Sequence, residues 1–280
     1  HPRHSQETTM PLPVIGAAMP TSALETYRDW ILEKNRDLEI QSFINAEVLN
    51  GDWQPLADQT RRLLDGYTGR LGIHGPFWGL NIAALDPDVR SVVARRMDQG
   101  LDVCAAIGAT QMVIHSPYTT WDYNNIDNYP GGRARLIEAA HATIGAAVKR
   151  AGDQGVVLVI ENIEDIDPLD RLRLAESFGS DAVRVSVDTG HAQYAHGSTG
   201  APPVDYYITA AGAMLDHIHL QDAEGYADRH WSLGEGTIRW AQVFRAIAAL
   251  PVRPRLLLEL RDNTQIPASM AFLAAEGLGE

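Results

Sequence analysis

The chain has 280 residues, a formal net charge of −13, 45% hydrophobic and 21% charged residues, and one cysteine. This is the composition of a globular domain, and its acidity argues against a nucleic-acid partner, because nucleic-acid binders usually present a basic face. The chain shows no apolar run of the roughly 18 to 20 residues that cross a membrane, no signal-peptide pattern and no cysteine pair, so we expect a cytoplasmic protein without membrane contact.

Residues 1–9 precede Met10, lack an initiator methionine and are expected to be an expression remnant, which leaves residues 10–280 for one domain. From residue 14 onward, short apolar runs alternate with longer stretches of helical period. Strands are predicted at residues 14–19, 39–45, 71–74, 111–115, 156–161, 183–188, 217–220 and 255–260. Helices are predicted at residues 24–35, 56–67, 89–107, 134–151, 169–178, 204–214, 240–250 and 268–275.

This alternation is typical of βαβ units around a parallel sheet, and eight such units predict a single closed (β/α)8 barrel, the TIM-barrel fold of the α/β class. Pro87 and Pro168 stand where a helix can start, and Gly108 and Gly179 stand where helices should stop. Cys104 falls within a helical pattern and is expected to be a small core residue.

Titratable side chains lie where the predicted strands from the third to the eighth end: His74, His115, Glu161, Asp188 with His191 just beyond it on a glycine-bearing turn, His219 and Glu259. In a barrel, the C-terminal strand ends and the loops after them form the active face, so we expect these residues to converge at one mouth. His217 has the same parity as His219 and is expected to point the same way one layer deeper, as a barrel-filling or supporting histidine.

Glu161 and Glu259 each follow a run of apolar residues typical of a buried strand. An unpaired carboxylate in such a place costs several kcal/mol, so the pair indicates a bound cation. Carboxylates and imidazoles without thiolates suit Mn²⁺, Zn²⁺, Co²⁺ or Fe²⁺, and this ligand set does not choose among them. Ligands from several strand ends leave room for substrate, which favours a catalytic metal over a structural one.

Several motifs resemble those of the xylose isomerase-like TIM-barrel superfamily, which includes sugar isomerases, keto-sugar 3-epimerases and the endonuclease IV family. The likeness covers residues 71–259. It is carried by His74-Gly75-Pro76-Phe77, Ile160-Glu161-Asn162, Val187-Asp188-Thr189-Gly190-His191, His217-Ile218-His219-Leu220-Gln221-Asp222, Asp228-Arg229-His230 with Gly234-Glu235-Gly236, and Leu258-Glu259.

Resemblance to the epimerase-like members implies one divalent metal held by Glu161, Asp188, His219 and Glu259. The implied activity is isomerisation or epimerisation of a small sugar, keto-sugar or polyol, by proton transfer through a metal-stabilised enediolate. Glu161 and Glu259 would be the catalytic acid/base pair. The same reading implies substrate contacts from His74, His115 and His191, and a possible homo-oligomer.

Resemblance to the endonuclease IV-like members implies a different centre with three metal ions. The further ligands would be His74, His115, His191, Asp228 and His230, and the activity would be that of a phosphodiesterase or abasic-site endonuclease. The acidic chain and the absence of Arg or Lys from residues 20–22 and 46–53 count against a DNA substrate. A mixed-valent iron oxidase and a non-enzymatic binding barrel are the remaining alternatives.

Aromatic residues gather in the segments after the third, fourth and seventh predicted strands: Phe77, Trp78, Tyr118, Trp121 and Trp231. Trp78 and Trp121 are the candidates for an apolar wall against the C–H face of a sugar. Arg229 lies between two candidate ligands and is expected to contact substrate or pair with those ligands. No glycine loop of the phosphate-binding kind supports a phosphorylated substrate.

Overall fold

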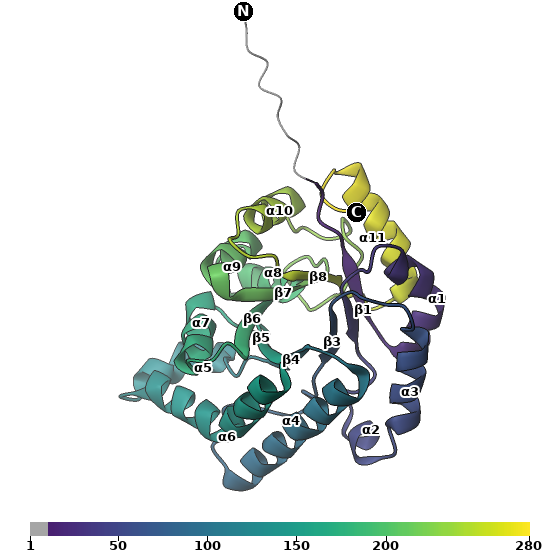
Figure 1. The fold of residues 1–280 in the computed structure, drawn as a ribbon. Coiled ribbons are helices and arrows are strands. Elements are labelled where there is room, and N and C mark those ends of the chain that lie inside the picture. Colours follow the sequence, from purple (N-terminus) through teal and green to yellow (C-terminus); the bar gives the residue numbers. More distant parts are fainter. Residues whose placement is uncertain (1–10) are drawn as a thin grey trace, which may run out of the picture.

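Eight parallel strands close into a barrel in chain order in a computed structural model that describes residues 11–280 (Figure 1), which confirms the predicted (β/α)8 fold. The expectation for residues 1–9 lies outside the described residues. The strands are β1 Gly16–Met19, β2 Leu38–Ile40, β3 Leu71–His74, β4 Gln111–His115, β5 Val157–Glu161, β6 Val183–Asp188, β7 Leu215–Leu220 and β8 Arg255–Leu258.

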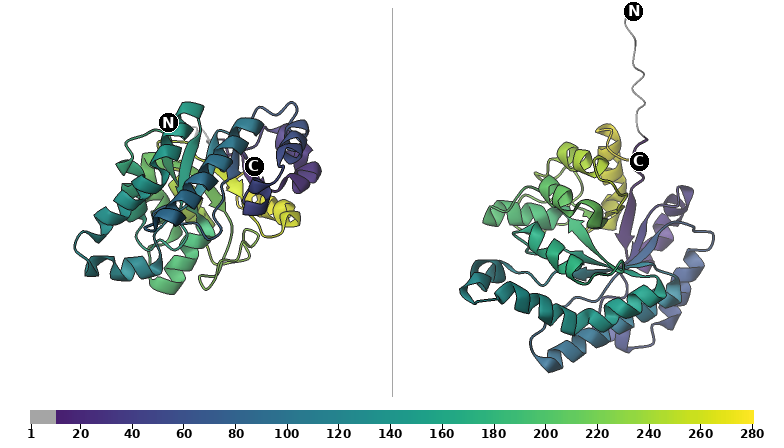
Figure 2. Two further views of the ribbon diagram at one scale, coloured as in Figure 1. Left: turned by 90° about the horizontal axis from the view of Figure 1, so that it is seen from below. Right: turned by 60° about the vertical axis from the view of Figure 1, so that its left-hand side comes forward.

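Helices form a layer around the strands (Figure 2). Within residues 11–280 they are α1 Thr21–Glu33, α2 Ala46–Asn50, α3 Gln54–Leu63, α4 Pro87–Ile107, α5 Thr120–Asn125, α6 Gly132–Gln154, α7 Pro168–Ser177, α8 Thr189–Thr199, α9 Val204–Ala211, α10 Trp240–Ala248 and α11 Ile266–Ala275. Short 3-10 turns occur at η1 Ile126–Asn128, η2 Gly212–Met214 and η3 Asn263–Gln265. None of these helices is long and apolar enough to cross a membrane.

The strands separate an outer apolar layer from a polar barrel interior. In β2, Leu38 and Ile40 belong to the hydrophobic core, whereas Glu39 between them forms hydrogen bonds with histidines of β7. Successive side chains of a strand point to opposite faces, so this alternation places one residue in two against the helices and the other inside the barrel. Cys104 lies in the same core, as expected.

Local capping explains why several helix boundaries match the sequence pattern. The Asp86 carboxylate accepts hydrogen bonds from the backbone N–H groups of Asp88 and Val89, and Pro87 occupies the first turn of α4. The same helix ends at Gly108 with a left-handed φ of 77°, which a glycine adopts without steric cost.

Several expected segments differ from the structure, among them the end of the second strand, the residues after it and the turn after the sixth strand. β2 ends at Ile40 rather than at residue 45, and residues 46–50 form α2 rather than a loop. The turn expected at residues 188–191 is the start of α8, because the Asp188 side chain caps the helix by accepting a hydrogen bond from His191 N at 2.7 Å. Gly190 and Gly197 lower the helix propensity of this segment, so its sequence does not read as a helix.

The two ends of the described chain meet beside β1. Ile15 N donates to Glu280 O at 2.8 Å, and the Tyr27 hydroxyl of α1 donates to Asn263 O at 2.7 Å, just before α11. Figure 1 accordingly shows α11 next to α1. The ring of helices is thus closed as well as the sheet, and the loops after the strands are held on a rigid frame.

Candidate metal centre at the barrel mouth

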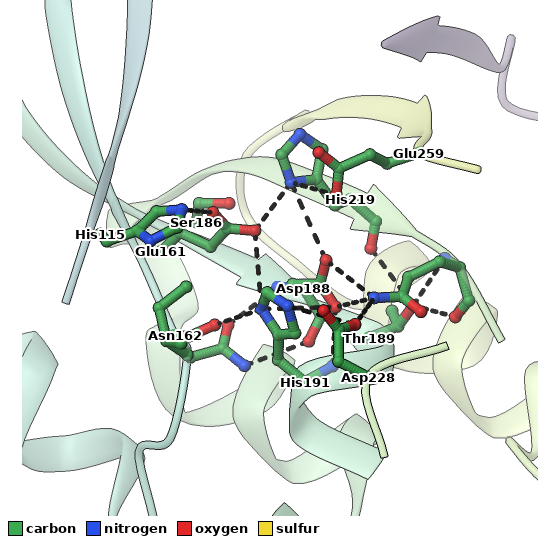
Figure 3. A network of polar contacts seen from close by, with 12 residues as sticks. His115, Glu161, Asn162, Ser186, Asp188, Thr189, His191, His219, Asp228 and Glu259 are labelled. Carbon is green, nitrogen blue, oxygen red and sulfur yellow. Dashed lines mark hydrogen bonds and ion pairs between the residues drawn. The ribbon is translucent and has the colours of Figure 1, made fainter. Parts of the chain in front are cut away.

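A central group of four ligand-type side chains stands at the C-terminal ends of neighbouring strands: Glu161 of β5, Asp188 of β6, His219 of β7, and Glu259 just after β8. One ligand atom from each lies within 4.8 Å of the others, and all four residues are buried. Figure 3 shows the three carboxylates turned toward the His219 ring, whose Nδ1 lies 2.8 Å from Glu161, 3.3 Å from Glu259 and 3.9 Å from Asp188.

Two further groups flank the central one within the described residues. His74 and His115 form the first together with Glu161, and His191, Asp228 and His230 form the second. The strand-end residues predicted from the sequence are therefore brought together at one mouth. Asp228 and His230 reach it from the loop after β7.

Glu161 faces two groups at once. Its Oε1 lies 2.8 Å from His219 Nδ1 in the central group, while its Oε2 lies 3.5 Å from His115 Nε2 and 3.7 Å from His74 Nε2. The buried Oε2 has no hydrogen-bond partner among the described residues. A buried carboxylate oxygen without a donor is costly, so its position fits an oxygen that binds a cation.

Three of the histidines are oriented by backbone carbonyl groups. The Nδ1–H groups of His74, His191 and His230 donate to the carbonyl oxygens of Gly75 (2.8 Å), Asn162 (2.8 Å) and Glu259 (3.1 Å). This leaves the Nε2 lone pair of each ring for a ligand. Metal-binding histidines usually donate their other ring N–H in this way, so the residues present fit a metal centre.

Side-chain amides help to position two residues of the central group, Asp188 and Glu259. The Asn162 side chain accepts from Asp188 N at 2.8 Å and donates to Asp188 O at 3.1 Å, which clamps β5 to β6. Gln41 Nε2 donates to Glu259 Oε1 at 2.6 Å. Asn162 thus positions Asp188 through its backbone, and Gln41 positions the Glu259 carboxylate directly.

Gln221 links the central group to the group formed by His191, Asp228 and His230. Its Nε2 donates to Asp188 Oδ1 at 3.1 Å and to Asp228 Oδ1 at 3.0 Å, while its Oε1 accepts from His230 N at 2.8 Å. Gln221 is fully buried. It is the residue through which the loop after β7 takes its position relative to β6.

Asp222 organises the rest of that loop. Its carboxylate accepts hydrogen bonds from the backbone N–H groups of Ala223, Gly234 and Ile238 and from Trp240 Nε1. A side chain at Gly236 would not fit, because a Cβ there would lie 2.3 Å from Asp222 Oδ1. The loop also holds His230 at a φ of 51°, which is uncommon for a non-glycine residue and is stabilised by these contacts.

The crowding of charges displaces the titration of the site residues. Burial raises the pKa of Asp188 to about 6, and burial lowers the pKa of His115 to about 3. For Glu161, burial acts to raise the pKa, but His219 and His74 together lower it well below its ordinary value. Such opposed shifts within one cluster are typical of a functional site.

The predicted substrate-binding residues do not all lie at the ligand groups. Arg229 is ion-paired with Glu224 at 2.8 Å, and its guanidinium lies over the Trp231 ring at 5.2 Å. Trp78 and Trp121 are 69% and 75% exposed. Trp78 is nevertheless connected to the site, because it packs on Phe77, which stacks on His115 at a centroid distance of 4.2 Å.

A cavity of about 420 Å³ opens beside the second flanking group. His191 and Asp228 line it, together with Tyr194, Tyr226 and Glu164. Its size falls within the usual range of small-molecule sites. It provides a place where a ligand could meet the metal centre from the loop side.

Sequence reasoning did not identify four of these residues as parts of the site: Glu39, Gln41, Asn162 and Gln221. Glu39 carries a signal that could have revealed it, since it is a charged residue between two outward-facing apolar residues of a strand. Asn162 and Gln221 stand in two of the motifs that carry the family resemblance, but a neutral amide in a motif does not reveal what it binds. Gln41 carries no such signal, because neutral amides are equally common on loop surfaces.

A family model described as xylose isomerase-like TIM barrel matches residues 40–276. Among solved structures, the TTHB071 protein of Thermus thermophilus, soaked with zinc chloride, is 28% identical, with 95% of this chain and 99% of that chain covered and a TM-score of 0.73. A D-tagatose 3-epimerase-like protein has the same fold, at 20% identity, 95% and 98% coverage and a TM-score of 0.73.

A probable endonuclease 4 of Mycobacterium leprae is 27% identical over 171 residues, which cover 59% of this chain and 64% of that protein. The chain spans less than two thirds of the length of the first curated relatives that it matches, 62% of one and 64% of the other.

Proposed function

The chain belongs to the xylose isomerase-like TIM-barrel family, and from this premise we propose that it is a divalent-metal-dependent isomerase or epimerase of a small sugar, keto-sugar or polyol. The observation that carries the proposal is the central group, in which Glu161 and Glu259 approach the same atom, His219 Nδ1, from separate strand ends. Two carboxylates at one buried cation site match the demands of proton abstraction next to a carbonyl group.

The residues of the central group would hold the ion: Glu161, Asp188, His219 and Glu259. When bound, a divalent ion polarises the oxygens of a hydroxy-ketone and makes the carbon-bound proton between them more acidic. One glutamate takes this proton from carbon, and the other delivers a proton to the opposite face, which inverts the carbon. Return of the proton to the neighbouring carbon, with transfer of the hydroxyl proton from one oxygen to the other, gives isomerisation instead.

The remaining residues of the mouth would bind and orient the substrate. His191 presents its Nε2 toward the cavity side of the centre, since its Nδ1–H is bound to Asn162 O. Trp78, stacked through Phe77 on His115, and Trp121 supply apolar surface for the C–H face of a sugar. Arg229, held by Glu224, would shape the loop.

The experiment is solvent-proton exchange in deuterium oxide with a panel of ketoses and inososes, followed by NMR. We expect the metal-loaded protein to place deuterium at the carbon next to the carbonyl of its substrate, and Glu161→Gln and Glu259→Gln to abolish this exchange. Glu47→Gln, at the surface in α2, is the matched control. A Glu161→Gln protein that exchanged protons at the normal rate would remove the basis of the proposal.

A second candidate function is a multinuclear phosphodiesterase, favoured by one specific observation. Glu161 offers its second oxygen to His74 and His115, and a third ligand group adjoins the first two. Three ions per chain by elemental analysis, with cleavage of abasic DNA or a small phosphodiester, would support this reading. Residues 20–22 and 46–53, which follow β1 and β2, contain no Arg or Lys to follow a DNA backbone, so we prefer the first proposal.

A further inference from the structure

Glu39 lies inside the barrel, one layer below the metal centre. It is 2% exposed and comes from β2, far in sequence from the ligands of β5 to β8. Both of its carboxylate oxygens lie 3.0 Å from His219 Nε2, and Oε2 lies 2.8 Å from His217 Nε2. Each oxygen of this buried carboxylate therefore has an imidazole donor.

His219 is therefore oriented differently from the other histidines of the centre. His74, His191 and His230 are held through Nδ1 by neutral backbone carbonyl groups, and their Nε2 atoms face the ligand groups. His219 is held through Nε2 by a charged carboxylate, and its Nδ1 faces Glu161 and Glu259. An ionised acceptor forms the stronger hydrogen bond and makes the imidazole a better electron donor at its other nitrogen.

His217 and Ser186 complete the support of Glu39. The Ser186 hydroxyl and His217 Nδ1 are 2.7 Å apart, and β6 pairs Ser186 directly with His217 in the barrel register. With the hydroxyl donating to Nδ1, the His217 proton sits on Nε2 and donates to Glu39. The side-chain polar atoms of Ser186, His217 and Glu39 then all have partners, so their protons can be placed in one consistent way.

We infer that Glu39 is a positioning residue of the metal centre: it holds His219 in the tautomer protonated at Nε2 and so directs Nδ1 toward Glu161 and Glu259, the residues with which it would hold the ion. This inference rests on the metal centre of the proposed function, whatever reaction that centre performs. Glu39, His217 and Ser186, the polar side chains inside the barrel, would then raise the affinity of the centre for its metal rather than bind substrate.

Glu39, His217 and His219 could also hold an ion themselves, because their ligand atoms lie within 4.8 Å of one another. The positioning role accounts better for the geometry. An ion bound to His219 Nε2 in addition to one at Nδ1 would require the ring to lose both protons. The distances of 2.8 to 3.0 Å around Glu39 are those of N–H donors bonded directly to oxygen.

The test compares Glu39→Gln with Asp37→Asn. Asp37 is also a buried carboxylate, two residues earlier and at the other end of the barrel, where it pairs with Arg70 at 2.6 Å. Zinc content is measured by elemental analysis, and zinc affinity by competition with a chromophoric chelator. We expect a 10- to 100-fold weaker affinity in Glu39→Gln, the usual effect of losing such a support, and a wild-type affinity in Asp37→Asn.

Long-range ¹H–¹⁵N NMR of the zinc-loaded wild-type protein supplies a measurement that needs no variant. We expect the His219 proton on Nε2, and a proton on Nδ1 would overturn the inference. Unchanged zinc affinity in Glu39→Gln would also overturn it, and so would the loss of one whole ion per chain with the remaining affinity intact. A wild-type protein that binds no divalent ion would instead refute the metal dependence of the proposed function.

Discussion

Replacing Gln221 with leucine tests how the loop after β7 is tied to the metal centre. The side chain is fully buried and joins three groups, Asp188, Asp228 and His230 N. Leucine has a similar size but forms no hydrogen bond. The substitution therefore removes the connection while filling most of the space, so that the lost hydrogen bonds dominate the effect.

The magnitude follows from the bonds that are lost. Two of them go to carboxylates, at 3.1 and 3.0 Å, and one comes from a backbone N–H at 2.8 Å. Hydrogen bonds to charged groups contribute roughly 1.5 to 3 kcal/mol each and neutral ones about 1 kcal/mol. Water can replace the bond to Asp228, whose side chain is half exposed. The bond to Asp188 and the bond from His230 N remain uncompensated, so we expect the free energy of unfolding to fall by about 2.5 to 4 kcal/mol.

The assay is urea denaturation of metal-free protein, followed by tryptophan fluorescence, with zinc content measured on separate loaded samples. Gln59→Leu is the matched control, because Gln59 also donates to a carboxylate, Glu25, but in an exposed hydrogen bond between α3 and α1. It should cost no more than about 0.5 kcal/mol. A loss below about 1 kcal/mol in Gln221→Leu, the low end for a single buried bond, would refute the reasoning.

Three further predictions concern the surroundings of the site. Asp222→Ala removes the acceptor of four hydrogen bonds, including that from Trp240 Nε1, and should destabilise the protein by about 3 to 5 kcal/mol in chemical denaturation. Asp165→Asn leaves the buried Arg171 guanidinium without its carboxylate partner and should cost about 3 to 5 kcal/mol in chemical denaturation. Asp153→Asn, in an exposed pair with Lys149, is the control and should leave the denaturation midpoint unchanged. In metal-free protein, burial acts to lower the pKa of His230, but Asp228 and Glu259 raise it from 6.5 to about 9. The stabilisation that the protonated His230 ring provides is complete below pH 6.5 and is lost as the pH rises toward 9. The melting temperature of the metal-free protein should therefore fall across this pH range more than that of the zinc-loaded protein. Equal falls in the two forms would contradict this prediction.

The barrel and the positions of the strand-end ligands could be predicted because both depend on local patterns. The five apolar residues before Glu161 predict a buried strand, and the change to a charged residue predicts that the strand ends with a carboxylate. Once the (β/α)8 order is recognised, chain topology alone brings Glu161, Asp188 and His219 to the same mouth. No distance had to be known for that inference.

What could not be predicted depends on contacts between distant parts of the chain. Glu39 and His219 are 180 residues apart in the sequence, and they pair because both point into the barrel at the same height. The alternation of side chains along each strand predicts that both point inward, but their relative height is known only once the register of every strand pair is known. Arg229 was expected to contact substrate or the ligands because it lies between Asp228 and His230. Arg229 pairs with Glu224, a contact that no sequence pattern encodes, and its expected contact with substrate stays a prediction.

The two candidate functions make incompatible demands on one atom, Glu161 Oε2. In an isomerase this oxygen must be free to take a proton from carbon, whereas in a multinuclear centre it binds an ion together with His74 and His115. A His74→Ala, His115→Ala protein separates the two cases, because both rings lie within 3.7 Å of that oxygen and neither belongs to the central group. If the centre holds one ion, the double variant keeps its zinc content and only substrate binding weakens. If Oε2 bridges two ions, the variant loses one zinc per chain, and Glu161 cannot be the base in the fully loaded protein.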